Sequence, residues 1–242
     1  MKKIIVCLLL LFCLACSNKS KPYLVAIDKQ WYSVALNGQT EFLNGFITDL
    51  LLETAKENKI EIKLISANWD NILEGLSLNK YQAVFSALNP YNFNMAKYDF
   101  SDEIIKTGYV LVVGKDKKYK DLNDLKNRHV GYLSGSGSLL ILQKYINIFD
   151  EAYGSIPVML GDITKNKIEG AVLSIIPAYK YVSDLFYDEL KIIDPTINDQ
   201  SIRIITIKNE NTAFLKMFNV SLKSLEKKGK IKELLIKWGL PN

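Results

Sequence analysis

Few side chains in this 242-residue chain are suited to covalent or metal chemistry. Its three cysteines, Cys7, Cys13 and Cys16, lie near the start, and His129 is the only histidine. The rest of the chain therefore lacks the residues for Ser-His-Asp or Cys-His catalysis and for most metal sites. His129 opens a predicted strand, which indicates a structural role. We expect a protein without catalytic residues, metal or cofactor.

Two stretches instead suit the non-covalent binding of a small molecule. The first, Ser86 to Lys115, reads as a strand end, a polar aromatic loop and a new apolar strand, Tyr109–Val113. Loops at strand ends are where open α/β sheets bind ligands. The second is the Gly/Ser loop Ser134-Gly-Ser-Gly-Ser138, between a predicted strand and a predicted helix. Its backbone N–H groups suit an anionic group, although a flexible glycine turn is the alternative interpretation.

The elements that must position these stretches alternate between strands and helices along the chain. Apolar runs predict strands at residues 23–28, 60–65, 83–88, 109–113, 129–133, 156–160, 170–173, 190–193 and 202–207. Amphipathic spacing predicts helices at residues 45–55, 69–78, 121–125, 139–149, 177–186 and 211–226, with a final helix ending near 238. This alternation indicates an α/β fold. We expect two lobes with a small molecule held between them.

Composition and charge exclude other classes of protein. The chain is 48% hydrophobic and 24% charged, as in ordinary globular proteins. Its formal net charge of +5 falls to +3 once Lys2 and Lys3 of a predicted signal peptide are removed. This excess is too small to indicate a nucleic-acid-binding protein.

The first residues read as a secretion signal. Lys2 and Lys3 precede a short apolar run, and Leu14-Ala15-Cys16 resembles the lipobox in which the cysteine is lipidated. We therefore expect a signal peptide over residues 1–16, a lipidated Cys16, and a tether over 17–22. The protein would be extracytoplasmic, lipid-anchored to a bacterial membrane in the periplasm or on the cell surface. A plain cleaved signal and an N-terminal anchor helix are the alternatives.

A series of short motifs covers nearly the whole mature chain. In order, they are Asp28-x-x-Trp31, Gly45-Phe-x-x-Asp-Leu50, Trp69-Asp-x-Ile-Leu-x-x-Leu76, Phe100-Ser-Asp102, Asp124-Leu125, His129-Val-Gly131, Gly135-Ser-Gly-Ser138, Ala171-Val-Leu-x-x-x-Pro177 and Lys237-Trp238. No single motif is specific, but their order resembles the extracellular solute-binding proteins of polar amino acid ABC importers, the glutamine-binding type among them.

The resemblance implies a fold and a set of partners. The fold would be the two-lobe, type II periplasmic-binding-protein fold, with two hinge strands that let the lobes close on a ligand. Lobe 1 would comprise residues 23–106 plus 206–242, and lobe 2 residues 107–205. The strands Tyr109–Val113 and Ile202–Thr206 would be the crossings. The partners would be a small solute and an ABC permease in the membrane, with the protein itself a monomer.

Some ligand-contacting positions of that family have counterparts in lobe 1 of this chain. Asp28 matches an acid that contacts the ligand side chain, and Trp31 and Trp69 match two aromatic residues that sandwich it. Ala87 and Asn89 match positions whose backbone and hydroxyl meet the ligand. Large aromatic residues are most often core residues, which is the alternative for both tryptophans.

The other positions include two departures from the family. Gly137 matches a backbone N–H donor to the ligand carboxylate, but Asn94 stands where the family has the arginine that grips this carboxylate. Ile175 stands where the family has the acid that holds the α-ammonium group, and a shift of one position gives Ser174. Asparagine cannot reproduce the two parallel hydrogen bonds of arginine.

These departures predict non-standard ligand recognition. A zwitterion buried without partners for both charges would cost several kcal/mol. The remaining residues suit a neutral or cationic molecule between the two tryptophans, with Asp28 as its counter-charge. Arg203, on a predicted crossing strand, is a candidate replacement for the missing clamp, and a surface ion pair is its alternative role.

Three functions follow from the sequence. The first is non-enzymatic: capture of a small solute and its delivery to a permease. The second is a cleft enzyme related to cyclohexadienyl dehydratases. Such enzymes act on anionic substrates, and Asn94 in place of an anion-binding arginine argues against this function. The third is a surface lipoprotein that has kept the fold and lost transport. The sequence favours the first.

Overall fold

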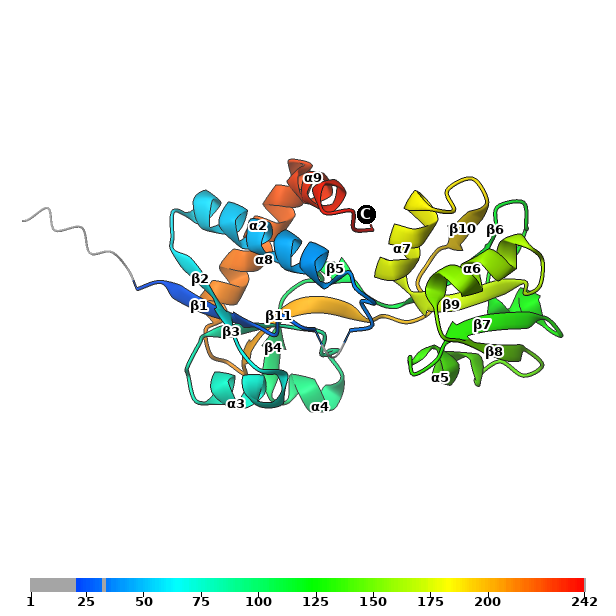
Figure 1. Ribbon diagram of the computed structural model, residues 1–242. Coiled ribbons are helices and arrows are strands. Elements are labelled where there is room, and N and C mark those ends of the chain that lie inside the picture. Colours follow the sequence, from blue (N-terminus) through cyan, green and yellow to red (C-terminus); the bar gives the residue numbers. More distant parts are fainter. Residues whose placement is uncertain (1–20, 32–33, 242) are drawn as a thin grey trace, which may run out of the picture.

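Two β-sheets divide the protein into two lobes, which lie side by side in the computed structural model (Figure 1). Residues 21–31 and 34–241 are described. The expected signal peptide, the lipidated Cys16 and the first part of the tether lie outside the described residues. Within them, no helix combines the length and apolar character needed to cross a membrane.

The first lobe is built on a sheet of order β2-β1-β3-β11-β4. Its strands are β1 (Tyr23–Ile27), β2 (Ile62–Ser66), β3 (Ala83–Ser86), β4 (Tyr98–Phe100) and β11 (Ser201–Ile207), with β5 (Ile105–Lys106) pairing with β11. β1 is parallel to β2 and β3, whereas β11 runs antiparallel to β3, β4 and β5. The three parallel strands therefore all end at the same edge of the sheet.

Alternating side chains of these strands build two cores, one on each face of the sheet. Val25 and Phe85 pack with α2 (Thr40–Asn58) and α8 (Thr212–Lys227) on one face. Ala26 and Val84 pack with α3 (Ile72–Ser77) on the other. The remaining helices of this lobe are α9 (Lys230–Lys237), α4 (Asn92–Met95) and the 3-10 turn Trp69–Asn71. The first sheet is thus covered on both sides (Figure 1).

The second lobe has a sheet of order β10-β6-β9-β7-β8. Its strands are β6 (Tyr109–Gly114), β7 (His129–Leu133), β8 (Phe149–Tyr153), β9 (Gly170–Ser174) and β10 (Leu190–Ile193), and its helices are α5 (Ser138–Leu142), α6 (Ile156–Thr164) and α7 (Ile175–Asp184), with a 3-10 turn over Leu122–Leu125. β7 is parallel to β8 and β9, whereas β6 is antiparallel to β9 and β10. This arrangement confirms the predicted α/β fold in two lobes.

The chain does not cross between the lobes at the two strands that we expected. β6 pairs only within the second sheet, and β11 pairs with β3, β4 and β5 of the first. The chain instead crosses through residues 107–108 and returns through residues 194–200. These two segments run side by side, because the Thr107 N–H donates to the Gln200 carbonyl at 2.9 Å and the Ile197 N–H to the Tyr109 carbonyl at 2.7 Å. On this pairing, the expected lobe boundary at 205/206 is better placed near residue 200.

Two local expectations for the second lobe are wrong. Residues 156–160, expected as a strand, begin helix α6, because the Ser155 side chain caps the Val158 N–H and Pro157 stands in the first turn. The helix expected over residues 139–149 ends at Leu142 as α5, and residues 149–153 form strand β8, whose charged pair Asp150-Glu151 obscures its apolar pattern. β8 lies at the sheet edge, where charged residues are tolerated.

A contact between the lobes lies away from the linking segments. The Nζ atom of Lys180 in α7 lies 5.3 Å from the ring centroid of Phe42 in α2, which is a cation–π distance. The C-terminal end of the chain lies between α9 and α7 in Figure 1. Next to it, a cavity of about 330 Å³ is lined by Ile175 of lobe 2 and by Ile105 and Leu235 of lobe 1.

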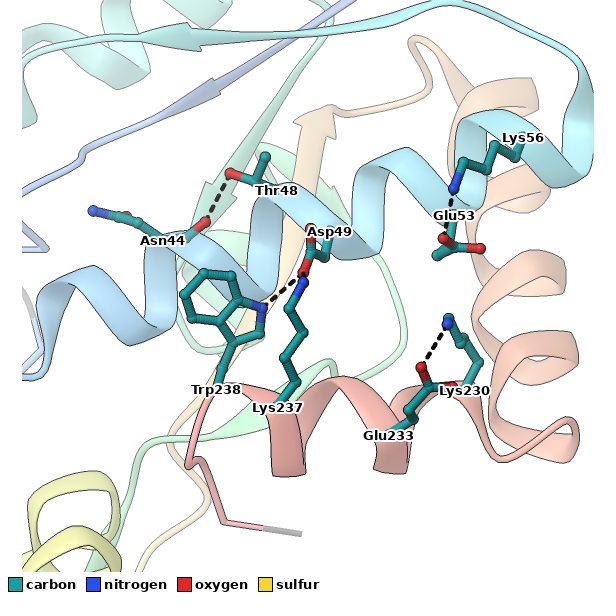
Figure 2. A network of polar contacts seen from close by, with 9 residues as sticks. All are labelled: Asn44, Thr48, Asp49, Glu53, Lys56, Lys230, Glu233, Lys237 and Trp238. Carbon is teal, nitrogen blue, oxygen red and sulfur yellow. Dashed lines mark hydrogen bonds and ion pairs between the residues drawn. The ribbon is translucent and has the colours of Figure 1, made fainter.

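Two of the motifs that carry the family resemblance meet in a structural clamp at the C-terminus (Figure 2). The Trp238 Nε1–H and the Lys237 ammonium both donate to the same Asp49 carboxylate oxygen, at 2.8 and 2.7 Å. The hydrogen bond from Lys237 is the largest influence on the pKa of Asp49 and lowers it. The indole lies against Gly45, where a Cβ atom would be 2.2 Å from the ring. This clamp fastens α9 to α2.

Candidate ligand-binding site

The carboxyl ends of the parallel strands gather the predicted ligand residues of lobe 1. Asp28 follows β1, Trp69 follows β2, and Ala87 follows β3. Because β1 pairs with β2 and β3 in parallel, these residues lie along one edge of the first sheet. That edge is where a ligand is expected in an α/β fold.

Asp28 and Trp31 are both buried in this edge. Asp28 is 5% exposed, and its carboxylate accepts a hydrogen bond from the Gln30 N–H at 3.1 Å. Trp31 is 2% exposed, and its indole N–H donates to Asn44 Oδ1 at 2.9 Å. Trp31 packs in the core of lobe 1, so it presents almost no surface to a ligand in this conformation.

Trp69 is placed differently from Trp31. It is half-buried at the start of a 3-10 turn and packs against the α3 side of the sheet. The structure therefore does not bring the two indoles together as an exposed pair. Their sandwich around a ligand stays a prediction that would require Trp31 to move.

Asn94, which the resemblance matches to the family's carboxylate-binding arginine, has a structural role. It is 8% exposed, and its Nδ2 donates to the Asn89 carbonyl at 2.8 Å. Its own N–H donates to the Tyr91 carbonyl at 2.8 Å. The Asn89 Nδ2 in turn donates to the Tyr91 hydroxyl at 3.2 Å. The side chain of Asn94 thus closes the turn that leads from β3 into α4.

Arg203 reaches the same edge but is bound to its own lobe. It lies opposite Ser86, the last residue of β3, in the β11–β3 pairing. Its Nη1 donates to the Ser101 carbonyl at 3.1 Å, and its Nη2 is 3.6 Å from the Glu103 carboxylate. The buried Nε finds no hydrogen-bond partner among the described residues. The role of Arg203 as a replacement clamp stays a prediction.

The predicted residues of lobe 2 lie beside the linking segments. Ser174 is 3% exposed, and its Oγ donates to the Thr107 carbonyl at 3.3 Å. Ile175 is 8% exposed, and its N–H donates to the Gly108 carbonyl at 2.8 Å. Neither side chain supplies a negative charge for an ammonium group. Both instead fasten the start of α7 to the first crossing.

Gly137 has a neighbour that sequence reasoning missed. The hydroxyl of Tyr109, the first residue of β6, lies beside it, because a Cβ atom at Gly137 would be 2.7 Å from this oxygen. Nothing in the apolar run Tyr109–Val113 indicated this contact, because it depends on how β6 and β7 are placed in the sheet.

No cluster of three or more His, Cys, Asp or Glu residues that could hold a metal ion occurs in the described part of the chain.

Known proteins resemble this chain in sequence. The chain is 23% identical over 202 residues to the arginine-binding extracellular protein ArtP of Bacillus subtilis, covering 80% of this chain and 77% of that protein. It is 22% identical over 229 residues to a probable histidine-binding protein of Neisseria gonorrhoeae, covering 92% of this chain and 84% of that one.

Solved structures share the fold. The unliganded, open L-cystine solute receptor of Neisseria gonorrhoeae aligns with a TM-score of 0.72 at 16% identity, over 91% of this chain and 93% of that one. The open substrate-binding domain 2 of Lactococcus lactis GlnP aligns with a TM-score of 0.69 at 19% identity, over 92% and 97%. The sequence profile of the bacterial extracellular solute-binding proteins, family 3, matches residues 23–241, and the chain therefore belongs to that family.

Proposed function

We propose that the protein captures a small solute outside the cytoplasm and delivers it to an ABC permease. Family membership supports the first part, and two relatives whose names include an ABC transporter support the second. In the described part of the chain, two short segments link the two lobes, which suits closure around a ligand. The ligand would bind the closed form more tightly than the open form, so ligand-bound protein would be mostly closed. The permease would then recognise the closed form. Multiple acyl chains on Cys16 would hold the protein at the membrane surface.

We further propose that the solute is neutral or cationic and is not held as an amino acid zwitterion. The observation that carries this proposal is the hydrogen bond from Asn94 to the Asn89 carbonyl, where a carboxylate-binding cation would be needed. On the opposite lobe, Ser174 donates to a backbone carbonyl and Ile175 is apolar, so neither balances an ammonium group. A zwitterion closed in this site would leave both its charges poorly paired, at a cost of several kcal/mol.

The competing possibility is an amino acid held in another way. Arg203 is the cation that could grip its carboxylate, but the guanidinium would have to exchange its contacts with Ser101 and Glu103 for the ligand. The names of the relatives favour amino acids with cationic side chains. Such a side chain would also suit a site that contains Asp28. The two possibilities therefore differ in the α-carboxylate and not in the side chain.

Thermal unfolding of the chain from Ser17, which retains every described residue, separates them. The panel contains free amino acids, the carboxamide of each one, polyamines and dipeptides. A ligand at about 100 times its dissociation constant stabilises the folded state by about 2.7 kcal/mol and raises the midpoint by several degrees. We expect shifts with carboxamides or amines that exceed those with the free amino acids.

The outcomes are distinct. A shift with free amino acids that their carboxamides do not produce would overturn the non-standard recognition and point to Arg203. If no compound in the panel raised the midpoint of thermal unfolding, the result would count against solute capture itself. For a cationic ligand, Asp28→Asn should weaken binding about tenfold, whereas the matched change at the exposed Asp188 in lobe 2 should leave it unchanged.

A further inference from the structure

The C-terminal turn of the chain (residues 239–241) makes a contact between the two lobes. Leu240 is 1% exposed, and its N–H donates to the Leu235 carbonyl of α9 at 2.9 Å, which fixes the turn to lobe 1. Pro241 lines the cavity of about 330 Å³ between the lobes. It also lines a second cavity of about 300 Å³, whose other walls come from lobe 2, Tyr179 among them. The turn therefore belongs to lobe 1 but lies beside lobe 2.

Lys180 of α7 brings a positive charge to the same place. Its Nζ atom lies 5.3 Å from the ring centroid of Phe42 in α2, and a Cβ atom at Gly239 would lie 3.9 Å from this nitrogen. The ammonium group also pairs with Asp184, one turn further along α7, at 2.6 Å. The Lys180 side chain is 32% exposed, so water only partly screens its attraction to the ring. One side chain of lobe 2 thus reaches both α2 and the C-terminal turn of lobe 1.

This contact lies on the opposite side of the linking segments 107–108 and 194–200 from helices α4 and α5 (Figure 1). In that view α7, α9 and the C-terminus lie above the linking segments, whereas α4 and α5 lie below them. α4 follows the end of β3, where Ala87 lies, and α5 follows the end of β7. Two bodies that rotate about a hinge separate on one side as they approach on the other. Closure that brings α4 and α5 together would therefore part Lys180 from Phe42.

We infer that the contact of Lys180 with Phe42 and the C-terminal turn is autoinhibitory: it holds the lobes apart on the α4/α5 side and breaks when they close. The inference rests on the proposed function, because closure serves to enclose a solute. A ligand that binds the closed form must offset the loss of this contact, so the contact weakens binding by the factor by which it lowers the closed population. A cation–π contact at a partly exposed site changes that population about threefold.

The test is Lys180→Gln, which removes the charge but keeps a side chain beside the turn. The chain from Ser17 contains no cysteine, so Phe93→Cys on α4 and Leu140→Cys on α5, both at exposed positions, can each carry a nitroxide spin label. Double electron–electron resonance then measures the distribution of distances between the two labels, with no solute present. We expect Lys180→Gln to raise the ratio of short to long distances about threefold over the labelled parent protein.

Lys126→Gln, the same substitution at an exposed lysine of lobe 2, is the matched control and should leave the distances unchanged. Phe42→Leu keeps apolar bulk but removes the aromatic ring, so it should raise the ratio as Lys180→Gln does, and the double variant should raise it no further. Equal ratios in Lys180→Gln and the labelled parent would overturn the inference, as would independent effects of the two single variants. Because the labels report lobe motion without a solute, a panel in which nothing binds would defeat the proposed function without deciding the role of this contact.

Discussion

Gly45→Ala is expected to lower the free energy of unfolding by about 3 kcal/mol, because the new methyl group has no room beside Trp238. A Cβ atom at Gly45 would lie 2.2, 2.3 and 2.5 Å from three atoms of the indole ring. The ring cannot simply swing away, since its Nε1–H donates to Asp49 at 2.8 Å (Figure 2). Relief therefore requires either loss of this hydrogen bond or a shift of α9 away from α2.

Urea-induced unfolding measures this effect. Gly161→Ala is the matched control, because it makes the same substitution within helix α6, where a Cβ atom would meet nothing within 4 Å. That variant should be as stable as the wild type or more stable by about 0.5–1 kcal/mol, from the helix propensity of alanine. The further change Trp238→Ala in the Gly45→Ala background should add much less destabilisation than it does alone. Equal midpoints for Gly45→Ala and wild type would contradict the clamp.

Acidification below about pH 4 is expected to destabilise the protein, because several carboxylates, Asp49, Asp99 and Glu57 among them, have lowered pKa values in the folded state. Hydrogen bonds from Lys237 to Asp49, from Lys208 to Asp99 and from Lys228 to Glu57 are the largest cause in each case. A lowered folded-state pKa means that the stabilisation is complete above the unfolded pKa, near 4. The stabilisation is then lost as the pH falls through the folded-state pKa.

Asp99→Asn tests the sign of this dependence. Its carboxylate accepts from Lys208 Nζ at 2.7 Å and from the Asn209 N–H at 2.8 Å, and its side chain is 21% exposed. The variant should lose about 1 kcal/mol at neutral pH and less in acid, so that its stability depends less steeply on pH than that of the wild type. Asp70→Asn, at an exposed position, is the control. Parallel curves for Asp99→Asn and wild type from pH 6 to about pH 2 would exclude this role.

Much of the fold could be predicted from local patterns. The apolar runs of β1, β3, β7 and β9 and the amphipathic α8 are strong signals, because each element buries one face or both. The errors fall where a pattern is weak or ambiguous. Residues 156–160 are apolar enough for a strand, but they form a helix because the Ser155 side chain caps its N-terminus. β8 carries charges because it lies at an edge.

The candidate site was predicted in part. The sequence placed Asp28, Trp69 and Ala87 after separate strands, and parallel pairing brings these positions to one edge. It also predicts that Asn94 departs from the family, because an asparagine has no guanidinium group. It could not predict that Trp31 is 2% exposed in the core or that Asn94 closes the turn before α4. Those facts depend on how different segments pack together, which a local sequence pattern does not show.

The sequence by itself determined the family and the α/β class, because motif order and periodicity are properties of the chain, and it predicts that the family's two charged clamps are missing. Only the tertiary structure decided where the chain crosses between the lobes, since strand pairing assigns β6 and β11 each to a single sheet. It also decided that the Tyr109 hydroxyl lies beside Gly137. Hydrogen bonds between residues far apart in sequence form only when the sheets are assembled, so no local pattern encodes them.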